Sequence, residues 1–255
     1  MRYGICCGFD MVGQVKEYGY DYMEGYASGV AAMDEKSYND ALESVKNSGI
    51  KCEAFNLLFP GDIKLIGEDA TPDNTAEYIK RLFPKLKALG GEIVVFGSGA
   101  AKNIEDGCTY TKAAAQYDAV LDLLEEYGNK FDIVVTVEHL NKREANFITS
   151  IAEAFSFIEG KSYKHVKLLI DYYHMKMEGE DESIISRLSG ELRHLHIADE
   201  AGRVFPFVAS KEKYADFFDK VRKIGYNERV SIEAGTEDLF ADAEMSAKLL
   251  LPMIS

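Results

Sequence analysis

Positive charge is scarce in this 255-residue chain, in which 29 Lys and Arg residues face 43 Asp and Glu residues. The formal net charge is −14 and the isoelectric point is about 4.9. Binding to a nucleic-acid backbone or to an anionic membrane requires clustered cations. The composition therefore argues against nucleic acid and membrane surfaces as partners.

Paired cysteines and long apolar runs are also missing. Cys6, Cys7, Cys52 and Cys108 form no CxxC pair and no regular framework, so we expect reduced core thiols. No stretch approaches the roughly 18 uncharged apolar residues of a membrane helix, and the first residues lack the apolar segment of a signal peptide. We expect a cytoplasmic protein that is neither exported nor membrane-spanning.

The chain does contain a repeating pattern, in which an amphipathic helical run stops at a glycine and a short apolar run follows. Seven glycines occupy this place: Gly19, Gly49, Gly90, Gly128, Gly160, Gly190 and Gly225. The strands predicted from this rhythm, with one more at the start, are 2–7, 20–25, 50–55, 92–97, 132–138, 166–171, 192–199 and 229–234. Successive glycines lie roughly 30 to 40 residues apart, the size of one strand with its crossover helix.

Eight such units in one chain predict an α/β fold of the closed (β/α)8 barrel type, a TIM barrel. The competing fold is a doubly wound open sheet, but CCGFDMVG lacks the GxGxxG spacing of a nucleotide loop. A long loop is expected over 59–72, and no linker or low-complexity segment breaks the rhythm. We therefore expect residues 1–255 to form a single domain.

In such a barrel the chemistry lies at the carboxyl ends of the strands. The last four predicted strands place Glu138, Asp171, His196 and Glu233 at or near those ends. Neighbouring strand ends converge, so we expect these side chains to meet.

Three converging carboxylates would repel one another unless a cation offsets their charge, so this set predicts one divalent metal ion. Oxygen donors with a single imidazole favour a hard ion; we expect Mn²⁺, with Mg²⁺, Co²⁺ and Zn²⁺ as alternatives. The competing interpretation is that each carboxylate caps the helix that follows it.

Three further residues near the strand ends have open roles. His194 is expected to face the same way as His196. It could be a metal ligand, a residue that supports a ligand, or part of a lower layer inside the barrel. Asp199 either orients His196 or caps the next loop. Glu24 is a weak candidate for substrate binding, with no partner in its own motif.

Two features bear on whether a substrate carries phosphate. The segment FGSGAAKN, residues 96–103, is interpreted as a tight strand exit rather than an anion cradle. The cations expected at the mouth are Arg203, Lys142, Arg143 and Lys102, which leaves a phosphorylated sugar open as a substrate.

The motifs EHLNKRE, DYYHM, HLHIADEAGR and SIEAG give the chain a specific family resemblance. The whole chain resembles the xylose isomerase-like TIM barrels, and its second half resembles their sugar phosphate isomerase/epimerase branch, which includes ketose 3-epimerases. One departure is RVFPFVAS, where the family commonly has a Pro-Gly loop after the arginine.

The resemblance implies roles for particular residues. It makes Glu138, Asp171, His196 and Glu233 the metal ligands, and Glu138 and Glu233 also the catalytic proton-exchanging bases. It assigns Glu144, His174 and Arg203 to substrate binding. It further implies that the chain assembles as a dimer or tetramer.

The expected activity is metal-dependent isomerisation or epimerisation of a small sugar or sugar phosphate through an enediolate. Hydroxypyruvate isomerase-like and inosose dehydratase-like enzymes are alternatives on the same cage of ligands. A metal-dependent apurinic endonuclease is disfavoured by the five histidines and the acidic surface, and a non-catalytic sugar-binding barrel by the two opposed glutamates.

Overall fold

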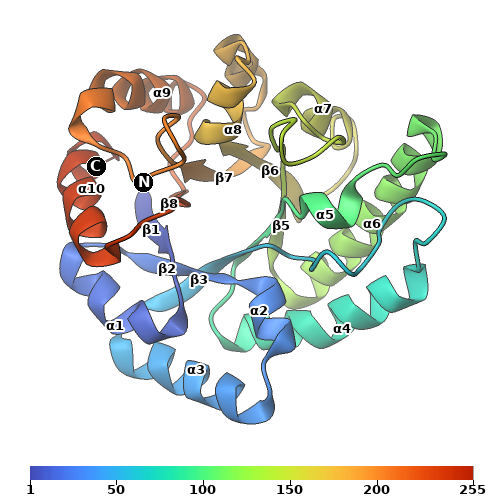
Figure 1. Cartoon of the computed structure of the whole chain (residues 1–255), viewed down its shortest axis with the longest axis horizontal. Helices are drawn as coiled ribbons and strands as arrows, with labels where there is room; N and C mark the ends of the chain where they lie inside the picture. The colour runs from blue at the N-terminus through green and yellow to red at the C-terminus, as the bar shows by residue number, and fades with distance from the viewer. Residues whose placement is uncertain (255) are drawn as a thin grey trace.

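A closed ring of eight parallel strands forms the centre of the molecule, and helices surround it (Figure 1). The computed structural model describes residues 1–254. The strands are β1 (Arg2–Cys6), β2 (Tyr22–Tyr26), β3 (Lys51–Asn56), β4 (Ile93–Phe96), β5 (Val134–Glu138), β6 (Val166–Asp171), β7 (Leu192–Ile197) and β8 (Arg229–Ile232). They follow one another in chain order around the ring, and β8 pairs with β1. The predicted (β/α)8 barrel and all eight predicted strands are confirmed, and the open sheet is excluded.

The helices lie outside the ring and differ widely in length. The α-helices are α1 (Val12–Val15), α2 (Ala27–Ala32), α3 (Glu35–Ser48), α4 (Pro72–Ala88), α5 (Gly99–Lys102), α6 (Tyr110–Phe131), α7 (Ile151–Ser156), α8 (Tyr172–Met177), α9 (Lys211–Lys223) and α10 (Leu239–Ile254). Short 3-10 turns are η1 (Phe9–Met11), η2 (Lys16–Tyr18), η3 (Glu182–Arg187) and η4 (Val208–Ser210). Side-chain caps start several helices; for example, Asp34 accepts the amide of Ser37 at the start of α3.

One of the seven glycines does not have the role predicted for it. Gly128 lies inside α6, and the helix ends instead at Asp132, whose φ is +51°. A methyl group on Gly128 would come within 2.6 Å of the His165 Cβ, so this glycine is needed for close packing rather than for helix termination. The other six have positive φ and lie at the expected turns.

The core has two parts, divided by the wall of strands. Inside the barrel a small apolar plug consists of Tyr22, Ala54, Ile93, Val95 and Leu169. Outside it, a much larger apolar layer fills the space between the strands and the helices. The plug lies between the carboxyl-end mouth of the barrel and its amino-end base.

The base of the barrel is held by paired charges. Glu53 is 1% exposed and accepts from both Arg2, at 2.6 Å, and Arg229, at 2.8 Å. Arg229 also pairs with Glu92, and both arginines stack against the Tyr22 ring with centroid distances of 5.9 Å. These contacts join four strands beneath the plug.

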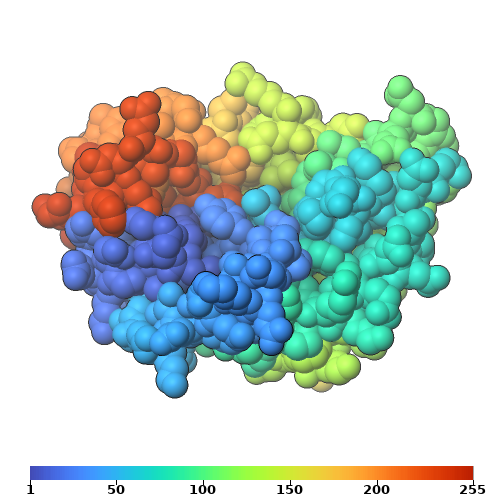
Figure 2. Space-filling view, turned by 60° about the horizontal axis from the view of Figure 1, so that its bottom comes forward, coloured from blue at the N-terminus to red at the C-terminus, as the bar shows by residue number. Residues whose placement is uncertain are grey.

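The last helix closes the ring against the first strands. Tyr20 donates to the Ala243 carbonyl at 3.0 Å and the Met1 ammonium donates to the Ile254 carbonyl at 2.8 Å. Figure 2 shows α10 (red) lying against the N-terminal segment (blue). Over residues 1–254, no helix combines the length and apolar character needed to cross a membrane.

The seam between β3 and β4 is the shortest in the ring. Its paired positions are Ala54 with Ile93 and Phe55 with Val94, whereas β5 pairs with β6 along 135–138. After β3 the chain runs without helix or strand until α4 begins at Pro72, which confirms the loop predicted over 59–72.

Candidate metal centre and active site

Four side chains meet at the barrel mouth, one from each of the strands β5 to β8 or the residue that follows. Parallel pairing sets Asp171 opposite His196, and His196 opposite Ser231, so their side chains share one level. Glu233 follows β8, and its amide donates to the Ile197 carbonyl. One ligand atom each of Glu138, Asp171, His196 and Glu233 lies within 4.8 Å of all the others.

The His196 ring lies at the centre of this cluster. Its Nδ1 is 3.2 Å from Glu138 Oε1, 3.4 Å from Glu233 Oε2 and 4.0 Å from Asp171 Oδ2. Its Nε2 points the other way, 2.9 Å from Glu24 Oε1. The imidazole therefore presents one nitrogen to three carboxylates and the other to a fourth.

The electrostatics of the cluster suit a cation. Burial raises the pKa of Glu138 above its usual range, and the charges of Glu233 and Asp171 raise it further. Burial would also raise the pKa of Glu233, but His196 and Arg203 outweigh it and hold that pKa well below its usual range. The carboxylates of Glu138 and Asp171, which are buried, and of Glu233, which is half-buried, form with one imidazole nitrogen a donor set that fits a hard divalent ion.

Asp171 also caps the helix that follows it, as the competing interpretation of these carboxylates predicts. Its Oδ1 accepts the His174 amide at 3.0 Å, which caps α8. Its Oδ2 remains directed toward His196 and Arg203, at 4.0 and 3.9 Å. Capping and cluster membership are compatible because a carboxylate has two oxygens.

The strand exit at 96–103 makes room for Glu138. A methyl group on Gly97 would lie 2.0 Å from Glu138 Oε2, so only glycine leaves that carboxylate its position. Ser98 follows with φ +34°, and its hydroxyl accepts the Phe59 amide. The segment is a tight strand exit, as expected, but its glycine also matters for the site.

Of the three residues assigned to substrate contact, Glu144 and Arg203 meet at the rim of the cavity, whereas His174 does not line it. Arg203 donates to Glu233 at 2.6 Å and to Glu144 at 3.1 Å, and its guanidinium lies 5.2 Å from the Tyr173 ring centroid. Its backbone φ is +54°, a conformation uncommon for a non-glycine residue and typical of functional sites. His174 is fully buried beside Asp171.

Asn141, which the sequence analysis missed, orients two of these residues. Its amide donates to His174 Nδ1 at 3.2 Å, and its side-chain Nδ2 donates to Glu144 at 2.8 Å. Because Nδ1 of His174 accepts, Nε2 carries the proton. That Nε2 has no hydrogen-bond partner among residues 1–254, so it is a free donor for a ligand.

A cavity of about 400 Å³ opens above the cluster and is lined by Glu138, Glu144, Arg203 and Glu233 together with Leu57, Ser98, Gly99, Ala100, Leu140 and Ala234. Asn56, also missed, borders the cluster by donating to Glu233 Oε1 at 2.6 Å, and its own Oδ1 is unpaired within the described chain. The space suits a small polar molecule.

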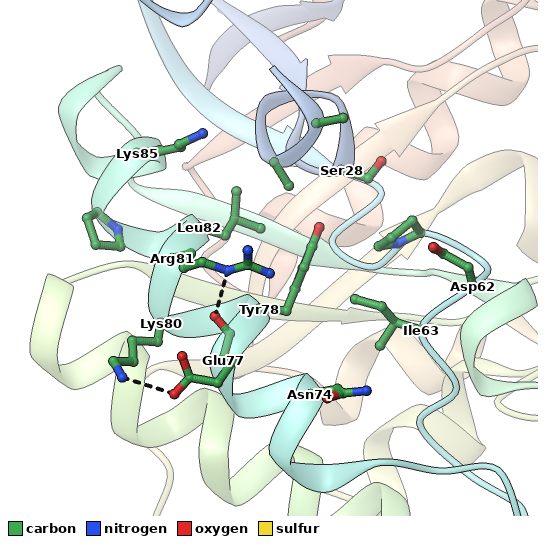
Figure 3. A pocket seen from close by; sticks show the side chains of 14 residues that line it. Ser28, Asp62, Ile63, Asn74, Glu77, Tyr78, Lys80, Arg81, Leu82 and Lys85 are labelled. Atoms are coloured by element: carbon green, nitrogen blue, oxygen red, sulfur yellow. Dashed lines mark hydrogen bonds and ion pairs between the residues drawn. The ribbon is translucent and has the colours of Figure 1, made fainter. Parts of the chain in front are cut away.

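A larger cavity of about 800 Å³ lies on the side of the barrel between α2, α4 and the loop after β3 (Figure 3). Lys80 and Glu77 at its edge pair with each other at 2.9 Å. Both groups of metal-competent residues found within 1–254 include His196, and none lines this cavity. The chemistry therefore belongs to the mouth.

Of the four cations expected at the mouth, only Arg203 lines the 400 Å³ cavity. Lys102 is fully buried, and its ammonium donates to the Glu138 carbonyl at 3.1 Å. Lys142 is 72% exposed and pairs with Glu178, and Arg143 lies outside the cavity. The expectation that all four cations face the site is therefore wrong.

The structure also shows what Glu24, His194 and Asp199 contact. Glu24 is not without partners, because its two oxygens contact His194 Nε2 at 2.8 Å and His196 Nε2 at 2.9 Å. His194 belongs to the layer below the cluster. Asp199 does not reach His196; it accepts from Ser210, Tyr214 and the Ala201 amide, so it organises its own loop.

The cysteines within residues 1–254 are all free, but only Cys7 and Cys52 are fully in the core. Cys6 and Cys108 are half-buried. Cys6 lies on the mouth side, where the Asn56 side chain approaches its sulfur at 3.6 Å.

Comparison with known proteins agrees with this arrangement. The sequence profile described as "xylose isomerase-like TIM barrel" matches residues 12–251. The chain belongs to the xylose isomerase-like TIM barrel family.

Two relatives in this family are named as ketose 3-epimerases. The L-ribulose 3-epimerase of Mesorhizobium japonicum is 23% identical over 197 residues, which is 76% of this chain and 65% of that protein. The D-psicose 3-epimerase of Enterocloster bolteae is 27% identical over 152 residues, 58% of this chain and 50% of that protein. The matches thus span less than two thirds of each relative.

Solved structures share the fold over a greater length. A D-psicose 3-epimerase crystallised in the presence of D-fructose superimposes with a TM-score of 0.85 at 18% identity, covering 100% of this chain and 99% of the other. At this identity the likeness establishes the barrel fold alone. The function must be argued from the site.

Proposed function

We propose that this chain is a metal-dependent epimerase of a small, unphosphorylated ketose. The observation that carries the proposal is the placement of Glu138 and Glu233 on one cavity, from strand positions separated in the ring by β6 and β7. Epimerisation needs two proton-transferring groups on opposite faces of one carbon. Ketose 3-epimerases among the relatives support this choice of reaction.

The metal ligands would be Glu138, Asp171, His196 and Glu233. When bound, a divalent ion supplies positive charge that stabilises the oxyanion formed as a C–H bond next to a carbonyl is broken. Mn²⁺ is our first choice because the donor set has three carboxylates and one imidazole.

The residues of the chain carry the proton steps. One glutamate takes the proton from the carbon next to the carbonyl, and the electron pair moves to the carbonyl oxygen to give an enediolate. The other glutamate, protonated, delivers a proton to the opposite face of the same carbon, which inverts it. Each positioned acid or base of this kind contributes about 10²- to 10⁴-fold in rate.

His174, Glu144 and Arg203 would hold the sugar. His174 Nε2 is a free N–H donor, while Glu144 and Arg203 offer an acceptor and a donor to hydroxyl groups. Arg203 also contacts Glu233 at 2.6 Å and thereby keeps that carboxylate oriented. Leu57 and Leu140 provide an apolar wall.

The charge of the cavity favours an unphosphorylated sugar. Three glutamates and a single arginine line it, and that arginine is already paired with two of the glutamates. A phosphate carries up to two negative charges and needs cations or several N–H donors. Such a group would be repelled here.

The test is proton exchange with D₂O in the presence of Mn²⁺, using a panel of free ketoses and their phosphates. We expect one or more free ketoses to gain deuterium at the carbon that epimerises. The absence of exchange in every ketose with Mn²⁺, Mg²⁺, Co²⁺ and Zn²⁺ would refute the proposal. Deuterium at the carbonyl-derived carbon, with an aldose product, would indicate aldose–ketose isomerisation instead.

A further inference from the structure

A fully buried carboxylate lies between two fully buried imidazoles directly beneath the proposed metal centre. Glu24 comes from β2, while His194 and His196 come from β7, across the barrel. Glu24 Oε2 is 2.8 Å from His194 Nε2, and Glu24 Oε1 is 2.9 Å from His196 Nε2. The two rings stand nearly perpendicular, 77° apart, so both nitrogens converge on one carboxylate.

The hydrogen-bond chemistry of this trio fixes its protons. A carboxylate that is ionised can only accept, so each facing Nε2 must carry hydrogen. Both Glu24 oxygens lie within hydrogen-bond distance of an imidazole, so the Nε2 of His194 and the Nε2 of His196 both face this carboxylate. The Nδ1 of His196 is then the atom left for the three carboxylates on its other side.

We propose that Glu24 is a positioning residue of the metal centre, which holds the His196 ring with Nε2 protonated and Nδ1 presented to the ion. This inference rests on the proposed function, because it gives the ligand His196 its support. His194 occupies the second oxygen of Glu24 and keeps the carboxylate from rotating. A carboxylate behind a metal-binding imidazole fixes its orientation and strengthens it as a ligand.

A different use of the same residues is disfavoured by their contacts. Cys6, Glu24 and His196 also have ligand atoms within 4.8 Å of one another. Both Glu24 oxygens, however, already accept from imidazoles.

The test compares two isosteric substitutions on neighbouring strands. In Glu24→Gln the side chain has one acceptor oxygen and an NH₂ group, so it cannot accept from both imidazoles. We expect calorimetric titration of the metal-free protein to give a dissociation constant for Mn²⁺ about 10- to 100-fold weaker than in the wild type, with one ion bound per chain. Glu53→Gln, at the base, is the matched control and should leave this constant unchanged.

A second readout needs no variant and decides the matter if Glu24→Gln fails to fold. In ¹⁵N-histidine-labelled wild-type protein loaded with Zn²⁺, we expect His196 to show a protonated Nε2 and a metal-bound Nδ1.

His194→Gln should weaken Mn²⁺ binding less than Glu24→Gln does, because it leaves the contact of Glu24 with His196.

Several results would overturn the proposal. These are an unchanged Mn²⁺ dissociation constant in folded Glu24→Gln, a metal-bound Nε2 in the NMR experiment, or a second bound ion that is lost in Cys6→Ser. A chain that binds Mn²⁺ as expected but exchanges no ketose proton would refute the proposed function alone. A wild-type chain that binds no ion would refute both.

Discussion

The two ends of the barrel use charge in opposite ways. At the amino end of the barrel, Glu53 and Glu92 pair with Arg2 and Arg229, and each contact joins a carboxylate to a guanidinium. At the mouth, four carboxylates converge on His196, counting Glu24 below it, and one of them, Glu233, also pairs with Arg203.

The difference separates stability from chemistry. Matched buried charges offset each other's loss of hydration, so removing one partner destabilises the fold. Unmatched carboxylates repel each other until a cation binds, so removing one should affect ion binding and catalysis more than folding. The same change, Glu→Gln, should therefore have different consequences at the two ends.

The largest effect is expected for Glu233→Gln at the mouth. The amide cannot accept or deliver the proton, so ketose epimerisation should fall by about 10³-fold or more, equivalent to roughly 4 kcal/mol. Deuterium exchange measured by NMR with saturating Mn²⁺ checks the result, and circular dichroism should show an intact fold. Wild-type exchange in this variant would remove Glu233 from the mechanism.

Gly97→Ala should have the next largest effect. The added methyl group would lie 2.0 Å from Glu138 Oε2, so the carboxylate must move. Misplacement of a catalytic group by about 1 Å costs on the order of 10²-fold in rate. Exchange rates at saturating Mn²⁺ provide the measurement, with Gly13→Ala, whose added methyl group would meet no atom within 4 Å, as the control. Equal rates for the two variants would contradict the role of Gly97.

Glu53→Gln tests the amino end of the barrel and should change only the stability of the fold. It leaves Arg2 and Arg229 without their shared partner, and we expect the free energy of unfolding to fall by about 2 kcal/mol. This is less than for a fully buried pair because Arg2 is 47% exposed. Urea unfolding measures the loss. If the exchange rate of the folded variant fell as well, the two ends would not be independent.

The smallest effect, and one of opposite sign, is expected for Glu138→Gln in metal-free protein. Burial and the neighbouring carboxylates raise the pKa of Glu138, so its proton is favoured in the folded state. Its contribution to stability is present below the ordinary pKa of 4.5 and is lost as the pH rises through the raised value. The variant should therefore gain stability relative to the wild type as the pH rises through the raised pKa of Glu138.

The check is urea unfolding between pH 4 and pH 8 in the presence of EDTA. With Mn²⁺ at 100 times its dissociation constant the wild type should gain about 2.7 kcal/mol, and the variant less, so the order reverses. A variant that is less stable than the wild type without metal, at every pH, would contradict the view of the mouth as unmatched charge.

The strand pattern and the strand-end residues were accessible from sequence because both depend on local periodicity. Short apolar runs after glycines predict β5 to β8, and the barrel rule brings Glu138 and Glu233 to one end. Gly128 misled because its role depends on contact with His165, distant in sequence. The sequence alone does not distinguish a glycine required for packing from one that ends a helix.

Partnerships across the barrel could not be predicted. Glu24 lacks a partner in its own motif, because its partners lie on the far wall in β7. Lys102 was expected at the mouth, but its side chain turns inward to a backbone carbonyl. Strand order tells which residues share an end of the barrel, whereas the direction of a long side chain depends on the packing around it.

The short seam between β3 and β4 gives the ring an uneven rigidity. The proposed ligands come from the side of β5 to β8, where the strands pair over longer stretches, while Leu57 and Ser98 follow the two strands of the short seam. We expect amide hydrogen exchange to be faster along that seam than along β6. Local opening there would loosen the part of the cavity wall that holds Leu57 and Ser98, while the proposed ligands stay assembled on the side of β5 to β8.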